Sequence, residues 1–202
     1  HITSAAQDVV FAIWDGGGRD TLNLAGYTER SVINLNAGSF SSAGGLVANI
    51  AIARGALIED AKGGAGSDII MGNSAANILY GNGGNDTLYG GLGRDLLSGG
   101  AGYDSFVFRD ALNSLTNRDS ILDFNTAADT VKLENAIFTK LLGATNTALS
   151  TAQFWKGAAA HDSNDRVIYN QATGALIYDS NGSAAGGAVQ FATIVNKTAL
   201  SS

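Results

Sequence analysis

A carboxylate or amide side chain recurs every nine residues through the middle of this chain, each time within a glycine-rich turn. Five consecutive nine-residue blocks occupy residues 63–107: GGAGSDIIM, GNSAANILY, GNGGNDTLY, GGLGRDLLS and GGAGYDSFV. Every block begins with glycine and has an apolar eighth residue. The sixth positions hold Asp68, Asn77, Asp86, Asp95 and Asp104. Oxygen ligands gathered in this way suit Ca²⁺, and a glycine- and aspartate-rich repeat of this period is typical of a calcium-binding parallel β-helix.

The period also predicts how the blocks stack. The glycines let the first six residues of a block form a tight turn, and the last three residues form a strand whose middle residue points inward. Two blocks make one coil of 18 residues, so the turns of alternate blocks lie on the same edge. Asp68, Asp86 and Asp104 are therefore expected along one edge, and Asn77 and Asp95 along the other.

Stacked carboxylates repel one another, and a divalent cation between them removes that repulsion. Calcium accepts about 6–8 oxygen ligands in flexible geometry, whereas magnesium prefers a tight octahedron and keeps its waters. We predict ions between Asp68 and Asp86, between Asp86 and Asp104, and between Asn77 and Asp95. The last is expected to be the weakest, because an amide replaces one anionic ligand. A flexible glycine linker is the alternative, but a linker has no reason to keep acids and apolar residues in fixed register.

Composition narrows the class of protein. Hydrophobic residues make up 45% of the 202 and charged residues 15%, which indicates a folded chain. The net charge of −6 and the lack of a Lys/Arg cluster argue against nucleic-acid binding. There are no cysteines, and no apolar run approaches the ~18–20 residues of a membrane span. The N-terminus lacks the pattern of a cleaved signal peptide, so we expect export by another route or a place inside a longer polypeptide.

The segment upstream of the blocks has short β-patterned stretches that end in turns. Strands are expected at residues 9–14, 21–24, 32–35, 49–53 and 56–58. The turn at residues 15–22 repeats the block pattern, and Asp15, Asp20 and Glu59 are candidate ligands of a further ion. A plain Asp/Gly turn with an exposed glutamate is the other interpretation.

Downstream of the blocks the glycine period stops. Short strands are expected in RDSILDF and DTVKL, where Asp119 is either a further ligand on the Asn77 edge or a solvated strand end. Residues 136–147 are predicted to form a short helix that buries Leu141 and Leu142. A hairpin follows, with strands at 166–169 and 176–178 around a turn at 170–174, and then a strand at 188–195. These strands are expected to cover the open end of the coil.

No pattern in the chain indicates catalysis. The two histidines, His1 and His161, do not form a zinc-binding His-Glu-x-x-His helix, and there is no G-x-S-x-G elbow. We interpret His161 as a surface residue, and Trp14 and Trp155 as core or cap residues.

The repeats and both flanks together resemble the C-terminal half of serralysin-type secreted metalloproteases. The stretches that carry the resemblance are FAIWDGGGRDTLNLAGY, INLN, GGL, IARGALIEDAKGGAGSD and the five blocks, covering roughly residues 9–125. The stretch DRVIYNQATGALIYDSNG is similar to the closing hairpin of many repeat-in-toxin proteins. The resemblance implies an all-β fold: a parallel β-roll that holds several calcium ions, with flanking antiparallel strands and a C-terminal hairpin cap. Residues 1–125 would contain the roll and residues 126–202 the capping strands.

The resemblance also implies further ligands and partners. Carried over position by position, the metal ligands fall on Asp15, Gly17, Asp20, Glu59, Gly64, Gly66, Asp68, Asn73, Ala75, Asn77, Asn82, Gly84, Asp86, Gly91, Gly93, Asp95, Gly100, Gly102, Asp104 and Asp119. The family's protease domain and its zinc-binding histidines do not occur in this sequence, nor does the apolar, Asp-containing tail, so we expect a fragment of a longer protein. The expected partners are calcium, an N-terminal protease domain and a type I secretion apparatus, and the expected location is extracellular.

Two functions follow from these observations. The first is a non-catalytic module whose calcium-coupled folding supports secretion. The second is an extracellular carbohydrate- or surface-binding module built on the roll, which a row of exposed aromatic side chains would favour.

Overall fold

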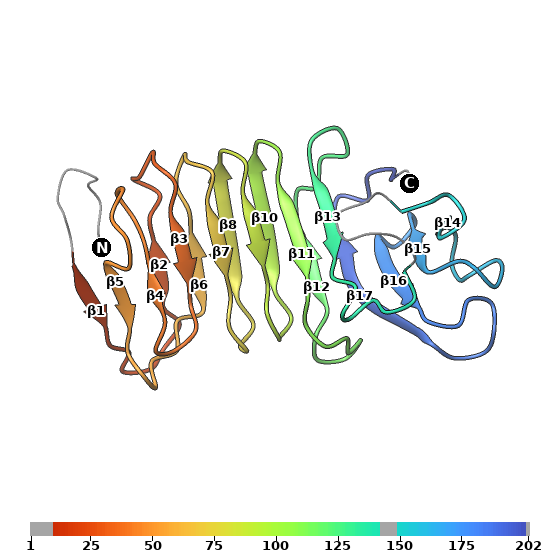
Figure 1. The fold of residues 1–202 in the computed structure, drawn as a ribbon, viewed down its shortest axis with the longest axis horizontal. Helices are drawn as coiled ribbons and strands as arrows, with labels where there is room; N and C mark the ends of the chain where they lie inside the picture. Colours follow the sequence, from red (N-terminus) through yellow and green to blue (C-terminus); the bar gives the residue numbers. More distant parts are fainter. Residues whose placement is uncertain (1–9, 142–148, 201–202) are drawn as a thin grey trace.

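The computed structural model describes residues 10–141 and 149–200. Within them the chain forms seventeen β-strands and no helix, so the all-β prediction is confirmed. Figure 1 shows the strands stacked side by side along the long axis of an elongated body, with the antiparallel strands of the C-terminal part at one end. The described part of the chain has no helix long and apolar enough to cross a membrane.

Two sheets form the sides of the roll, and a third lies at its N-terminal end. The third sheet contains β1 (Phe11–Ile13), β5 (Ile50–Ile52) and β4 (Phe40–Ser41). One side is a five-stranded sheet in the order β13 (Thr130–Leu133), β11 (Ser105–Phe108), β9 (Thr87–Tyr89), β7 (Ile69–Met71) and β3 (Val32–Asn34). The other is a nine-stranded sheet in the order β14 (Phe154–Lys156), β15 (Val167–Asn170), β16 (Ala175–Asp179), β17 (Ala188–Ile194), β12 (Asp119–Ile121), β10 (Leu96–Ala101), β8 (Ile78–Gly83), β6 (Asp60–Lys62) and β2 (Thr21–Asn23).

The register of the sheets confirms a coil of 18 residues. Successive blocks alternate between the two sides, and strands two blocks apart pair in parallel. Leu79 of β8 pairs with Leu97 of β10, and Ile70 of β7 pairs with Leu88 of β9. The resulting architecture is a parallel β-roll, as predicted.

The apolar eighth positions of the blocks form the centre of the core. Their side chains are at most 1% exposed: Ile70, Leu79, Leu88, Leu97 and Phe106. Leu22, Ile33 and Ile121 extend the same row beyond the blocks and are also buried. Each coil therefore buries one apolar side chain per sheet, and this burial holds the two sides together.

The C-terminal strands continue one side of the roll. β17 pairs in parallel with β12, and the predicted hairpin is present as β15 and β16. Phe138 and Phe191 pack edge to face with ring centroids 5.1 Å apart, and Phe108, which follows the last block in β11, contacts Phe191 at the same distance. These aromatic contacts close the core at this end of the roll. The division into residues 1–125 and 126–202 stays a prediction, and the β12–β17 pair joins the two parts in one sheet.

Several local predictions are wrong. Residues 136–141 form turns, with Phe138 N–H donating to Glu134 and Leu141 N–H to Phe138, and the rest of the predicted helix, including Leu142, lies outside the described residues. Residues 56–58 form no strand. Trp14 is 80% exposed because it follows β1 on the side that faces solvent.

Trp155 lies in β14 among the C-terminal strands, which agrees with the cap alternative of its prediction. It is 37% exposed and stacks on His161, with ring centroids 4.5 Å apart. His161 is exposed, as predicted.

Two neighbouring leucines test the inward direction of the eighth position. Leu97→Ala is expected to lower the free energy of unfolding by about 2–5 kcal/mol, because it leaves a cavity in the row of core side chains. Leu96→Ala is the matched control: Leu96 is 37% exposed on the outer face, so its loss is expected to be about 1 kcal/mol or less. Urea denaturation under fixed calcium measures both. Equal losses would contradict the assignment.

Candidate metal centre

The acids of alternate blocks stack as the 18-residue coil predicts. Asp68, Asp86 and Asp104 are each 1% exposed. The main-chain N–H of Asp68 donates to Asp86 Oδ1 at 2.7 Å, and the N–H of Asp86 donates to Asp104 Oδ1 at 2.8 Å. Ser31 donates to Asp68 Oδ1 at one end of this series, and Asp104 donates to Asp129 Oδ1 at the other. We call this series, from Ser31 to Asp129, the Asp86 ladder.

The other edge carries a second series, which we call the Asp95 ladder: Asn77, Asp95 and Asp119. Asn77 N–H donates to Asp95 Oδ1 at 2.8 Å, and Asp95 N–H donates to Asp119 Oδ1 at 3.2 Å. Asp119 is 4% exposed, so it is a buried member of the ladder and not a solvated strand end.

The second oxygens of the stacked acids give the strongest indication of a metal. Among the described residues, Asp86 Oδ2, Asp95 Oδ2 and Asp104 Oδ2 are buried without a hydrogen-bond partner. A buried carboxylate oxygen without a donor is costly, and native proteins rarely keep one. Asp86 and Asp104 lie one coil apart on one edge and Asp95 lies on the other, so these oxygens fit cations that bind between the turns.

Burial also opposes ionisation of these acids. It raises the pKa of Asp86 to about 7, and the charges of Asp68 and Asp104 act in the same direction. Burial likewise raises the pKa of Asp95 and of Asp119, which face each other, and the charge of Asp110 adds to both effects. A divalent cation would reverse this balance by favouring the charged forms.

The turns require glycine because neighbouring turns and carboxylates lie too close to leave room for a Cβ atom. A Cβ on Gly81 would collide with Asp86 Oδ2, and a Cβ on Gly102 would collide with the carbonyl oxygen of Gly84. Gly93 and Gly102 also have φ angles of +127° and +140°, which side chains disfavour. Only glycine at these positions allows the turns to stack at the spacing of the strands.

The second and fourth positions of the blocks stack on their counterparts one coil away. A Cβ on Gly91 would meet the carbonyl of Asn73, and a Cβ on Gly93 would meet that of Ala75. The same holds for Gly100 against Asn82 and for Gly84 against Gly66. Main-chain oxygens of successive turns therefore lie in line beside the carboxylates. That they bind metal, together with those of Gly17 and Gly64, stays a prediction.

The three acids predicted upstream of the blocks also come together. Asp20 N–H donates to Glu59 Oε2 at 2.8 Å, and a hydrogen bond between the side chains of Asp15 and Asp20 raises the pKa of Asp20. The N–H of Gly17 donates to Asp15 Oδ1 at 2.6 Å and lowers the pKa of Asp15. Glu59 is buried, in contrast to the exposed glutamate of the plain-turn interpretation.

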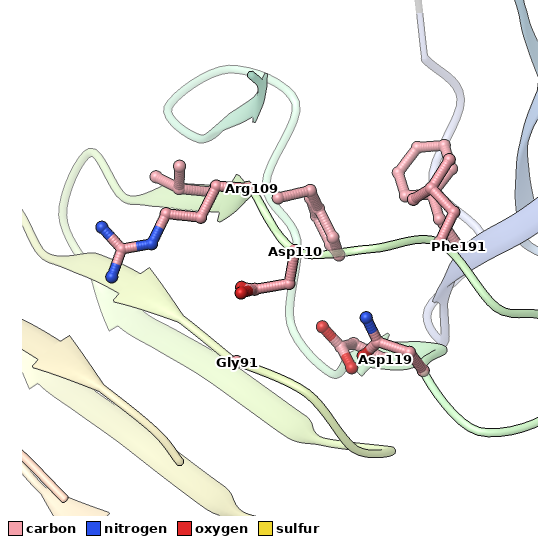
Figure 2. A pocket seen from close by; sticks show the side chains of 10 residues that line it. Gly91, Arg109, Asp110, Asp119 and Phe191 are labelled. Carbon is pink, nitrogen blue, oxygen red and sulfur yellow. The ribbon is translucent and has the colours of Figure 1, made fainter. Parts of the chain in front are cut away.

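Two acids that the sequence pattern missed belong to the same edges. Asp129 accepts from Asp104 N–H at 3.0 Å and ends the Asp86 ladder. Asp110 lies with Asp119 in a small cavity of about 10 Å³, and Figure 2 shows both carboxylates within it. Arg109 does not neutralise them, because its guanidinium lies over the ring of Tyr89. Asp119 was among the predicted ligands and Asp129 was not. Both fall outside the nine-residue count because the last turns are longer, with ladder spacings of 24 and 25 residues.

The comparison with protein families identifies the fold's relatives. The family model described as "Peptidase M10 serralysin C terminal" matches residues 1–166. The chain belongs to this serralysin C-terminal family. Metallopeptidase AprA of Pseudomonas marginalis is 57% identical over 132 residues, which are 65% of this chain and 28% of that protein. Serralysin C of Dickeya chrysanthemi shows the same identity and coverage.

Other relatives extend the match. Metalloprotease AprA of Pseudomonas entomophila (strain L48) is 44% identical over 184 residues, which are 89% of this chain and 36% of that protein. The serralysin C-terminal chain thus spans about a third of the length of these relatives. Among solved structures, the AlgE6R3 subunit of the Azotobacter vinelandii mannuronan C5-epimerase is similar with a TM-score of 0.41 and 31% identity, covering 64% of this chain and 66% of that one.

The raised pKa of Asp86 predicts how stability depends on pH in calcium-free buffer. The folded state keeps a proton on Asp86 up to about pH 7, whereas the unfolded chain loses it near pH 4. The folded state therefore binds more protons between about pH 4 and pH 7, and the free energy of unfolding is expected to fall as pH rises through this window.

Urea denaturation in chelator at a series of pH values measures this trend. Asp86→Asn is the control, because it removes the titrating group and should reduce the slope. A calcium-free protein that becomes more stable between pH 4 and pH 7 would contradict the prediction.

Proposed function

We propose that this serralysin C-terminal domain is a calcium-operated folding module that supports the export of a secreted metalloprotease. The observation that carries the proposal is the set of buried, unpartnered oxygens on Asp86, Asp95 and Asp104. These atoms need a cation, and the adjoining carboxylate and carbonyl oxygens are the hard donors that calcium prefers.

The residues of the turns have distinct roles in this proposal. The aspartates of both ladders supply anionic oxygens, and each Oδ1 is already held by an N–H of the neighbouring coil. The other oxygen remains for the metal. The glycines let main-chain carbonyls approach without a Cβ between them. When calcium is bound, it supplies the positive charge that lets the stacked acids stay ionised.

Mass action sets the size of the effect. Extracellular calcium modules have dissociation constants of about 10⁻⁴–10⁻³ M. One site at tenfold saturation stabilises the folded state by about 1.4 kcal/mol, and three sites together by about 4 kcal/mol. Domains of ordinary stability have about 5–15 kcal/mol in total. Several such sites can therefore decide between an unfolded chain and a folded roll.

This dependence suits secretion. Where calcium is scarce, repulsion between acids and the conformational entropy of the glycines favour the unfolded chain, which can pass through a narrow type I channel. Outside the cell, calcium binds only to the folded roll, so its binding energy becomes folding energy. The family relationship supports a preceding zinc protease domain as the cargo, and an extracellular location.

The alternative, a carbohydrate-binding face, finds less support. Of the repeat tyrosines, Tyr80 lies under Lys62 Nζ at 5.4 Å and Tyr89 under the guanidinium of Arg109 at 4.1 Å. Tyr103 is 67% exposed. The two rings covered by cations do not form an open platform with the third.

Circular dichroism during calcium titration tests the proposal. The wild-type chain in chelator is expected to lose most of its β-spectrum at neutral pH and to regain it cooperatively as calcium is added, because the ions offset the buried charge. Magnesium at the same concentrations should be a poor substitute. A β-spectrum that is identical in chelator and in calcium would refute the calcium-coupled folding.

Substitution of a ladder acid tests the site itself. Asp86→Asn is expected to raise the calcium midpoint several-fold, since Asp86 faces two predicted ions. Glu134→Gln removes the same charge outside both ladders and should leave the midpoint unchanged. The same titration measures both variants, and equal midpoints for the two would argue against Asp86 as a ligand.

A further inference from the structure

The contact between Glu59 and Asn77, one coil before the Asp95 ladder, differs from the contacts within both ladders. Along both ladders, a main-chain N–H donates to the carboxylate of the next coil. Between Glu59 and Asn77, which are also 18 residues apart, the direction is reversed. Asn77 Nδ2 donates to the carbonyl oxygen of Glu59 at 2.8 Å.

The orientation of the Asn77 amide follows from its partners. Asn77 Oδ1 accepts from the N–H of Asn73 at 2.8 Å, and an N–H can only donate. Nδ2 faces the carbonyl of Glu59 and also lies 3.1 Å from Asn73 Oδ1, and a carbonyl can only accept. Asn77 is 1% exposed, so these partners replace water.

The side-chain amide of Asn73 also lies in the space between residues 58–59 and the turn at residues 72–77. Asn73 Nδ2 donates to the carbonyl oxygens of Ile58 at 2.8 Å and of Leu35 at 3.2 Å. Asn36 Nδ2 donates to the carbonyl of Gly72 at 3.0 Å. Main-chain oxygens that could face a cation are therefore already occupied by amide N–H groups.

The side chain of Asn77 differs from the aspartates of the later blocks in its hydrogen bonding. Asp86, Asp95 and Asp104 each keep a buried oxygen without a donor, whereas both polar atoms of the Asn77 side chain are satisfied. Between Glu59 and Asn77, the amide N–H group supplies the partial positive charge that a metal ion would supply between stacked aspartates. A calcium ion there would have to displace three hydrogen bonds from the Asn73 and Asn77 amides to the carbonyls of Leu35, Ile58 and Glu59.

We propose, on the basis of the calcium-binding function proposed above, that the gap between residues 58–59 and the turn at residues 72–77 holds no ion. The amides of Asn73 and Asn77 take its place. Asn77 thereby sets the number of calcium ions that the roll binds. The predicted ion between Asn77 and Asp95 belongs to the next gap along this edge, between the turns at residues 72–77 and 90–95.

Three chains test the proposal: wild type, Asn77→Asp and Asn77→Ala. Each is dialysed against saturating buffered calcium, its folding is checked by circular dichroism, and bound calcium is counted by elemental analysis. Asn77→Asp is expected to bind one more ion per chain than wild type, because it replaces the amide donor with an oxygen ligand. Asn77→Ala removes the amide without adding a ligand, so its count should not exceed that of wild type while its calcium midpoint rises.

A measurement on the wild type does not depend on whether the variants fold. In the calcium-saturated, ¹⁵N-labelled chain, the side-chain NH₂ protons of Asn77 are expected to exchange with solvent far more slowly than those of the exposed Asn125. An Asn77 amide that exchanges as fast as that of Asn125 would overturn the proposal, as would a folded Asn77→Asp chain with the wild-type count. If the wild-type chain takes up no calcium, the proposed function itself fails.

Discussion

The fold depends on one constraint. The pitch of the roll stacks acidic side chains on one another, and the positions at which they stack are buried. Each strand pair advances the chain by one strand spacing, about 4.8 Å, so the sixth positions of alternate blocks cannot move apart. Hydrogen bonds from the adjoining coil hold one oxygen of each acid. They leave the other oxygen of Asp86, Asp95 and Asp104 without a partner. No donor among the described residues satisfies these oxygens.

The remaining features of the roll follow from this constraint. Turns that stack so closely have no room for a Cβ, which explains why Gly81 lies against the carboxylate of Asp86. The inward row of apolar side chains supplies the burial that keeps the two sheets in register. Such a row is thin compared with the core of a two-layer domain. The repeat itself contributes one central apolar side chain per nine residues, so ion binding would add to the stability of the roll.

Much of the roll was predictable because glycine, acidic and apolar residues recur in the sequence with a period of nine. The fixed distance from Asp86 to Asp104 determined the stacking, and the apolar residue two positions later determined the core. Beyond the blocks this rule fails. Asp129 and Asp119 join the ladders through turns of different length, and no count along the sequence fixes the length of an irregular turn. Asp110 was missed for the same reason.

Other failures arose where tertiary contacts override local pattern. The residue type of Trp14 suggested a core or cap residue, but the alternation of β1 turns it to solvent, where it is 80% exposed. Residues 136–141 have a helical pattern of apolar side chains, yet Phe138 is held by Phe191 and by Tyr178, whose ring lies 5.1 Å away, and the segment forms turns around this cluster. The sequence alone does not contain the position of such partners.

The distribution of satisfied and unsatisfied groups shows that the roll is not uniform along its axis. Toward the N-terminal end, Asp68 Oδ2 accepts from Gly64 N–H at 2.7 Å, and the Asn77 side chain is fully hydrogen-bonded. Toward the C-terminal end, Asp86, Asp95 and Asp104 carry the unpartnered oxygens, and Asp110 adds a further charge beside Asp119. The buried oxygens without a donor, which are costly, are therefore concentrated in the later coils. The asparagines of the second block are thus not imperfect copies of the repeat. Their amides close the second block with hydrogen bonds, whereas acids of the later blocks keep oxygens without a donor.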